Sequence, residues 1–152
     1  MGLFVLNRWQ KFWGLPPAAR RLFMAAAFLI FGLWIALRFL PFSFVRRVVE
    51  RATDAPSPSL SNETTTQPVA WAIRAAGRFL PFATCLPRAL SGYLLLHRKG
   101  CPADLKIGVT RDPDGQFLAH AWVESGGGVV IGTLPDLARY TPLQGESNRI
   151  VS

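Results

Sequence analysis

Residues 84–131 leave the fewest choices for the fold of this chain, because one well-delimited helix and three strand-like segments follow each other there. Thr84 suits the N-cap position, where its hydroxyl can accept a hydrogen bond from a first-turn N–H. Gly100 supplies the stop signal. An apolar stripe with helical spacing lies between them: Leu86, Leu90, Tyr93, Leu94 and His97. The pattern predicts a helix over residues 85–99.

Three strand-like segments follow this helix, and the first two have a period of two. Leu105, Ile107 and Val109 alternate in the first, residues 117–124 (FLAHAWVE) form the second, and residues 129–133 (VVIGT) form the third. The turn signals RDPDGQ and SGGG separate them. A helix followed by a three-stranded meander predicts an α+β fold, in which the helix packs on a small antiparallel sheet.

Cys85 falls in the first turn of the predicted helix, where the positive end of the helix dipole favours the reactive thiolate. The alternative is a small buried hydrophobic side chain, as most free cysteines are. Cys101 is near the other end of this helix, roughly 20 Å away, beyond the ~7 Å limit for a disulfide. We therefore expect a reduced, cytosolic catalytic region.

His120 lies in the middle strand, on the same face as Leu118, Trp122 and Glu124. A histidine beside a tryptophan in a strand is often a packed, hydrogen-bonded residue. However, a cysteine at a helix start followed by a histidine on the next sheet is also the arrangement that a thiol peptidase uses. The order of Cys85 and His120 favours this second interpretation.

Residues 22–37 contain no charged or strongly polar side chain, and the chain stays largely apolar to residue 42. The run is shorter than the ~20 residues of a typical membrane-spanning helix, and it lacks the features of a signal peptide. Three interpretations are open: a membrane-crossing helix, a helix lying in the bilayer surface, and a helix buried against the rest of the protein. The apolar residues surround the helix, which disfavours the surface-lying one.

Residues 53–68 (TDAPSPSLSNETTTQP) have the composition of a flexible linker, and a helix is predicted over residues 69–80. The chain thus divides into an apolar helical segment at 1–52, with possible membrane contact through residues 22–42, a linker at 53–68 and a core at 69–152. The net charge of +8 is scattered and no nucleic-acid-binding module is present, so we expect no nucleic-acid partner. An anionic membrane or an acidic peptide would suit this charge.

The core resembles the lasso peptide leader peptidases, a transglutaminase-like and papain-related family. The family pattern is Cys-Leu-x-Arg-(Ala/Ser)-Leu, a Leu-rich helix, Gly-x-Pro-Ala, Ile-Gly-Val and Ala-His-Ala-Trp-Val-Glu. The matching residues are Cys85–Leu90, Gly100–Ala103, Ile107–Val109 and Ala119–Glu124. The resemblance covers residues 69–143, and the apolar helix before them is similar to that of stand-alone members. It implies a transglutaminase-like core with a nucleophile-bearing helix on a small sheet.

The resemblance implies that Cys85 is the nucleophile and His120 the general base, with no cofactor or metal. Relatives carry an aspartate on the strand after the histidine. A two-residue turn at Gly126 and Gly127 would set Thr133 across from His120, so the acid is expected near residues 132–134, which are Gly132, Thr133 and Leu134. Asp136 is the nearest carboxylate and is the predicted third residue. Otherwise Thr133 or a backbone carbonyl must orient the imidazole.

The resemblance also implies partners. The substrate would be a lasso peptide precursor, delivered by a separate leader-recognition protein and passed to a macrolactam synthetase, the lasso cyclase. The expected location is the cytoplasm, with association to the cytoplasmic membrane left open. Two other functions stay open: a transglutaminase-type acyl transferase, and a non-catalytic membrane-anchored scaffold of the same maturation complex.

Overall fold

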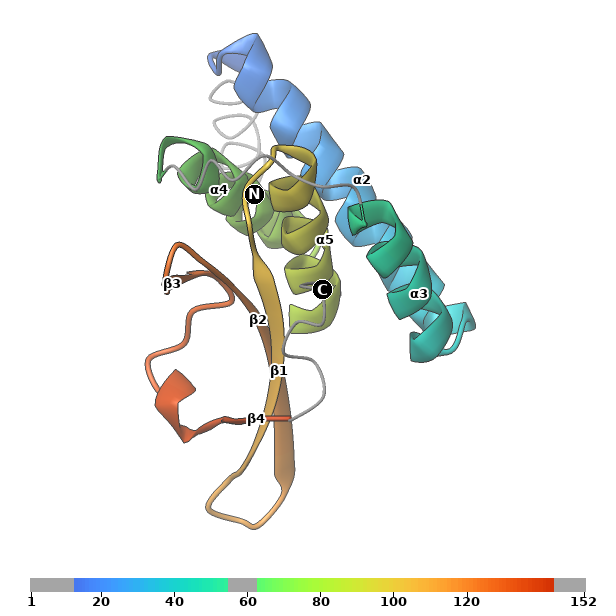
Figure 1. Ribbon diagram of the computed structural model, residues 1–152, viewed down its shortest axis with the longest axis vertical. Coiled ribbons are helices and arrows are strands. Elements are labelled where there is room, and N and C mark those ends of the chain that lie inside the picture. Colours follow the sequence, from blue (N-terminus) through green and yellow to red (C-terminus); the bar gives the residue numbers. More distant parts are fainter. Residues whose placement is uncertain (1–12, 55–62, 144–152) are drawn as a thin grey trace, which may run out of the picture.

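The computed structural model describes residues 13–54 and 63–143, in which four α-helices precede a small sheet (Figure 1). The helices are α2 (Pro17–Phe39), α3 (Phe42–Thr53), α4 (Glu63–Phe79) and α5 (Cys85–Arg98). The strands are β1 (Asp104–Arg111), β2 (Phe117–Ser125), β3 (Gly128–Ile131) and β4 (Thr141–Pro142), with the short 3-10 helix η1 (Leu137–Arg139) before β4. All pairings are antiparallel, in the order β3-β2-β1-β4. The predicted α+β fold is confirmed.

Helix α5 has the predicted start and stop, but its start is capped differently. Thr84 is the N-cap residue, yet its side chain makes no capping hydrogen bond, so the expected hydroxyl cap is wrong. At the other end Gly100 has a φ of 77°, and the N–H of Cys101 donates to the carbonyl of Leu96 at 2.9 Å. This is the glycine-terminated helix end that the sequence predicted.

The hairpin of β1 and β2 forms the long axis of the sheet. Arg111 pairs with Phe117, and Asp112 closes the turn by accepting from the backbone N–H groups of Gly115 and Gln116. Gly115 has a φ of 81°, which explains why Asp-Gly marks this turn. The β2–β3 pairing is less regular, because its register shifts between Val123 and Glu124.

The core lies between the helices and one face of the sheet. α2 packs on α4 and α5, and α5 packs on β2. Helical residues such as Ile30, Ile73 and Leu96 share one buried cluster with Ala121 and Val123 of β2. Because β2 alternates, its intervening residues face away from this cluster.

Helix α4 begins earlier than the sequence indicated. We expected it to begin at Val69, but it begins at Glu63 and contains Pro68. Pro68 is the sixth residue of this helix, beyond the first-turn N–H groups that lack helical partners, so it removes one backbone hydrogen bond from the helix. The end of the predicted linker is therefore helical, and residues 55–62 lie outside the described residues. The division into a segment, a linker and a core stays a prediction.

Helices α2 and α3 form one side of the molecule, away from the sheet (Figure 1). α2 is long and apolar enough to cross a membrane by length and composition, although core helices and signal sequences also pass that test. Only 11 % of its most apolar window is buried, so packing against the protein covers one side of the helix. Ala26 and Ile30 form that buried side.

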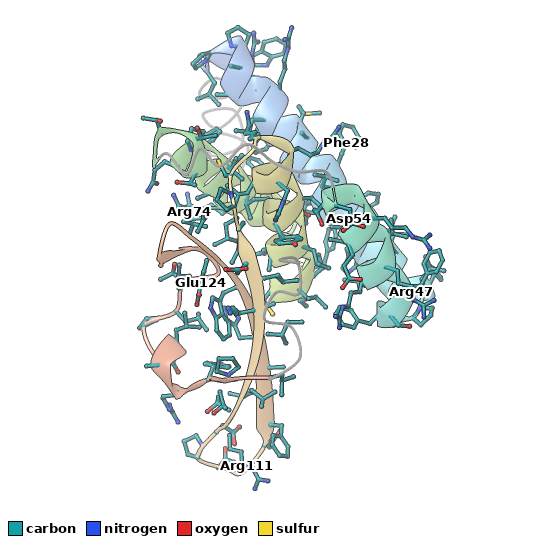
Figure 2. The ribbon with its side chains drawn as sticks, viewed as in Figure 1. Phe28, Arg47, Asp54, Arg74, Arg111 and Glu124 are labelled. Carbon is teal, nitrogen blue, oxygen red and sulfur yellow. The ribbon has the colours of Figure 1, made fainter. Side chains whose placement is uncertain are left out.

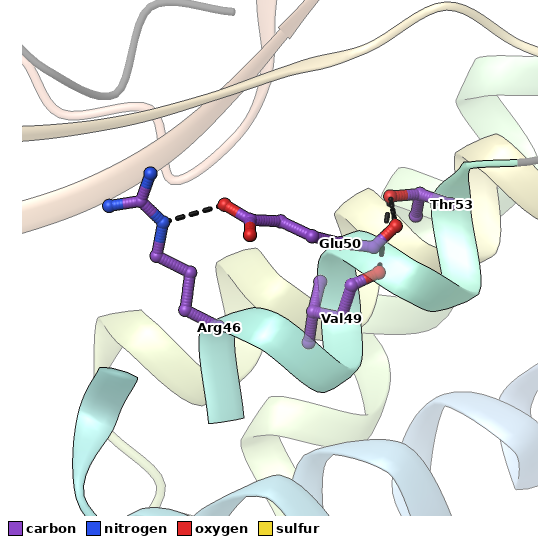
Figure 3. A network of polar contacts seen from close by, with 4 residues as sticks. All are labelled: Arg46, Val49, Glu50 and Thr53. Atoms are coloured by element: carbon purple, nitrogen blue, oxygen red, sulfur yellow. Dashed lines mark hydrogen bonds and ion pairs between the residues drawn. The ribbon is translucent and has the colours of Figure 1, made fainter. Parts of the chain in front are cut away.

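Helix α3 returns along α2 and packs on α5 through Val45 and Val49. Figure 3 shows the polar contacts that hold its last turns. Arg46 Nε lies 2.7 Å from Glu50 Oε1, and the buried Thr53 hydroxyl lies 3.1 Å from the carbonyl of Val49 and 3.0 Å from that of Glu50. The hydroxyl thereby offers a donor to the carbonyl of Glu50, one of the last four carbonyls of the helix, which lack helical partners.

Candidate active site

Cys85 is the first residue of α5 and has a free, half-buried thiol. Its side chain packs at the edge of the main core cluster. Thr84 makes no side-chain cap, so the backbone N–H groups of Cys85 and Leu86 are not taken by it, whereas Pro87 contributes no N–H. The sulfur therefore lies at a positive helix end whose donors are not taken by a side-chain cap.

Arg88 joins the start of α5 to the end of α4. Its Nη2 donates to the carbonyl of Gly77 at 2.9 Å and to that of Leu80 at 3.4 Å. A Cβ on Gly77 would lie 2.9 Å from Arg88 Nε, so a larger residue there would displace the guanidinium. The positive charge also complements the negative end of the α4 dipole. Arg88 thus fixes the segment that leads into Cys85.

His120 is held by a backbone carbonyl. It pairs with Gly108 of β1, and its Nε2 lies 2.7 Å from the carbonyl oxygen of Gly132. Because a carbonyl oxygen can only accept, Nε2 carries the proton, and Nδ1 of the neutral ring is left as an acceptor. Trp122 stacks beside the ring at 6.3 Å between centroids, and the Tyr140 ring lies at 5.7 Å.

Gly132 can present that carbonyl only because it is a glycine. Its φ is 80°, and a Cβ there would lie 2.7 Å from the carbonyl oxygen of Ala121 and 3.0 Å from Trp122 Cα. The register shift in the β2–β3 pairing adds a residue to β3, so the expectation that Thr133 lies across from His120 is wrong. The acceptor is a backbone carbonyl near the position where relatives carry their acid.

Asp136 lies farther along the chain, at the N-cap of η1. Its carboxylate is exposed, with Oδ2 3.7 Å from Arg139 Nη1. In the described part of the chain no hydrogen bond joins Asp136 to His120, and the carbonyl of Gly132 makes the orienting contact instead. This is the backbone alternative that the sequence left open. A catalytic role for Asp136 stays a prediction.

The nucleophile and the histidine belong to two halves of the candidate site. Ala121 and Val123 face the core cluster against which Cys85 packs, and His120 contacts the segment between β3 and β4. Within residues 13–54 and 63–143 no hydrogen bond joins Cys85 to His120. Their pairing in catalysis stays a prediction. Catalytic hydrogen bonds are often long before substrate binds.

Three other residues have contacts of their own. Glu124 accepts a hydrogen bond from Trp122 Nε1 at 2.9 Å, so it supports the tryptophan. His97 lies at the far end of α5, where its Nε2 is 3.2 Å from the carbonyl oxygen of Ala103. Cys101 is fully buried in the core. Among the described residues no three or more His, Cys, Asp or Glu side chains gather as metal ligands.

A family model described as the transglutaminase-like superfamily matches residues 28–145, which is more than half of the chain. The match begins inside α2 and includes Cys85, Arg88, His120, Gly132 and Asp136. No curated protein and no solved structure matches the chain.

Proposed function

Because this chain belongs to the transglutaminase-like superfamily, we propose that it is a cysteine peptidase that removes the leader from a lasso peptide precursor. The observation that carries the proposal is the free thiol of Cys85 at an uncapped helix start, in a domain whose histidine has a fixed tautomer. The motifs around Cys85 and His120, which resemble the leader peptidases, support the choice of substrate.

The reaction begins at the sulfur. Nδ1 of His120 accepts the proton of the Cys85 thiol, and the sulfur attacks the carbonyl carbon at the end of the leader. The tetrahedral intermediate collapses to a thioester between leader and enzyme. The core peptide leaves as an amine and takes the proton from the imidazolium. Water, deprotonated by the same histidine, then releases the leader as a carboxylic acid.

The start of α5 supplies the stabilisation of the oxyanion. The backbone N–H groups of Cys85 and Leu86 belong to the first turn, where no helical carbonyl can accept from them. The absence of a Thr84 side-chain cap leaves them available to the substrate oxygen. Donors of this kind contribute about 10²- to 10³-fold to the rate of acyl transfer.

Gly132 takes the part that a carboxylate has in related triads. The task of that residue is to hold the histidine tautomer and orientation, and a carbonyl oxygen 2.7 Å from Nε2 does both. It is neutral, so it stabilises the imidazolium less than a carboxylate would.

The partners follow from the resemblance. We propose that a separate leader-recognition protein delivers the precursor and that a macrolactam synthetase receives the freed core peptide. All three proteins would act on a ribosomally made peptide in the cytoplasm, where Cys85 stays reduced.

The test is precursor cleavage followed by mass spectrometry, with the full chain and its recognition protein. Cys85→Ala is expected to eliminate cleavage, and the matched variant Cys101→Ala is expected to retain it. Circular dichroism confirms that both variants are folded. Retained cleavage by a folded Cys85→Ala variant would disprove the proposal.

Two specific observations favour other functions. The family match favours a transglutaminase-type acyl transferase, in which an amine and not water resolves the thioester. That activity would release the leader as an amide. Its mass would exceed that of the free leader acid by the mass of the added amine minus one water. The lack of a Cys85–His120 hydrogen bond in the described residues favours a non-catalytic scaffold. A thiol-reactive probe that labels Cys85 no faster than a free thiol would support the scaffold.

A further inference from the structure

Helix α2 exposes a continuous apolar stripe on the side opposite its buried residues. The stripe has helical spacing, and Phe28 and Phe39 are its most exposed members, at 66 % and 81 %. The adjoining helix α3 also exposes two apolar residues. We call the whole surface the outer face; it consists of Met24, Phe28, Phe31, Ile35 and Phe39 of α2 and Phe44 and Val48 of α3. Contiguous apolar surface of this kind marks an interaction site.

The charges around the outer face are mostly positive, with the exposed Asp54 at the end of α3 as an acidic exception. Arg21 and Arg38 are exposed near the two ends of α2. Exposed arginines of α3 add to them, and Figure 2 shows Arg47 on the same outer side of the helices as Phe28. Glu50 is the one acidic residue of α2 and α3, and Arg46 pairs with it at 2.7 Å. The partner of this surface should therefore carry negative charges on its outside and have an apolar layer beneath them.

The opposite side of α2 is built into the domain. Ala26 and Ile30 are fully buried in the cluster that also holds Val69 of α4 and Leu96 of α5. A helix that crossed a bilayer alone would have to leave these contacts and expose the core. The outer face can meet a membrane without any such change, because it is already exposed.

We propose that the outer face docks on an anionic lipid bilayer, with α2 lying in the plane of the headgroups and still packed on α4 and α5. A helical ridge of aromatic side chains enters a fluid interface without needing a complementary groove, and arginines at both ends reach lipid phosphates. The interpretation disfavoured by the sequence, a surface-lying helix, thus fits once α4 and α5 cover the other side of the apolar run.

The test is vesicle flotation with the full chain. The probes are vesicles of phosphatidylcholine alone and of phosphatidylcholine mixed with phosphatidylglycerol, each at low and high salt. We expect binding to the anionic vesicles and a decrease at high salt, because screening weakens the contribution of the arginines. Failure to bind the anionic vesicles would overturn the proposal and favour a protein partner for the outer face.

Two pairs of matched variants locate the binding surface. Phe28→Ser should weaken partitioning roughly tenfold, whereas Phe117→Ser, at 68 % exposure on the β1–β2 hairpin, should leave it unchanged. Arg47→Glu should weaken it roughly fivefold or more, whereas Arg111→Glu should not. Figure 2 shows Arg111 at the far end of the hairpin from Phe28 and Arg47. Equal loss within either pair would overturn the assignment of the face.

A third comparison separates docking from crossing and from catalysis. Membranes from expressing cells, washed with alkaline carbonate, should release a docked protein, and retention would show that α2 crosses the bilayer and overturn in-plane docking. Cys85→Ala should bind vesicles like the natural chain. Vesicle binding and precursor cleavage are therefore independent measurements. The peptidase proposal can fail while vesicle binding is observed, and the membrane proposal can fail while cleavage is observed.

Discussion

Two regions of this protein each hold one cysteine and one histidine, and they differ in what surrounds them. In the candidate active site, Cys85 is half-buried at the positive end of α5, and His120 donates to a backbone carbonyl at 2.7 Å. At the far end of α5, Cys101 is 0 % exposed, and His97 lies 3.2 Å from another backbone carbonyl.

The residue types are the same, so exposure and position along the helix distinguish the two regions. Cys101 follows the C-terminal end of α5 and is fully buried, so a substrate cannot reach its sulfur. Only the first region combines an accessible sulfur with an electropositive helix end.

The largest expected effect separates the two histidines. His120→Ala should lower the rate of precursor cleavage roughly 10²- to 10⁴-fold, because general acid–base catalysis contributes about that much. His97→Ala should change the rate little. Single-turnover cleavage followed by mass spectrometry measures both. Equal losses would mean that the far end of α5 also takes part in catalysis.

The next effect concerns the residue that holds His120. Gly132→Ala should lower the cleavage rate roughly a hundredfold, since small displacements of a catalytic group have effects of that size. The control is Gly127→Ala, because Gly127 also has a positive φ, 83°, but nothing within 4 Å of its missing Cβ. That variant should show only the cost of backbone strain. A Gly132→Ala variant with normal cleavage would contradict the role of the carbonyl.

A smaller effect tests the hydrogen bonds by which Arg88 joins the start of α5 to the end of α4. Arg88→Met should lower the free energy of unfolding by about 1–3 kcal/mol, because the carbonyl of Gly77 loses its partner. Arg98→Met, on the exposed last turn of the same helix, should change it by less than about 0.5 kcal/mol. Urea denaturation measures both. Similar losses of unfolding free energy in the two variants would show that the hydrogen bonds of Arg88 do not stabilise the helix start.

The smallest effect is a pH dependence at the far end of α5. Burial raises the pKa of the Tyr93 hydroxyl above its usual value, while a hydrogen bond with Thr53 opposes part of that shift. The resulting stabilisation is complete below the unfolded-state pKa of about 10 and is lost as the pH rises through the raised folded-state value. Tyr93→Phe should therefore weaken the alkaline fall in stability, measured by thermal unfolding. An unchanged slope would show that Tyr93 does not titrate with unfolding.

Local signals in the sequence predicted much of the fold. The stop at Gly100 and the turn around Gly115 depend on a few neighbouring residues, and both are confirmed. The early start of α4 was missed because a proline such as Pro68 usually marks a helix boundary, whereas this helix continues through it. The short pairing of β4 with β1 has no local signal, since it joins residues far apart in sequence.

The candidate site was predictable by residue type and less so by geometry. The sequence indicated Cys85 and His120, and it named Asp136 as the third residue, with Thr133 or a backbone carbonyl as the alternative. It could not show that a β-bulge shifts the register between β2 and β3, because Val129, Val130 and Ile131 are all apolar and show no alternation that an extra residue could interrupt. Arg88 was visible within a motif, but its contact with Gly77 depends on how α4 meets α5.

Phe82 connects helix α2 with the approach to the thiol. Its ring lies 4.7 Å from Trp34 and 6.4 Å from Phe31, and it precedes Cys85 by three positions along the chain. Removal of the apolar helix would therefore change the surroundings of Cys85. A shortened, more soluble version of the protein would also lose one wall of its own core, because Ala26 and Ile30 of α2 are buried there.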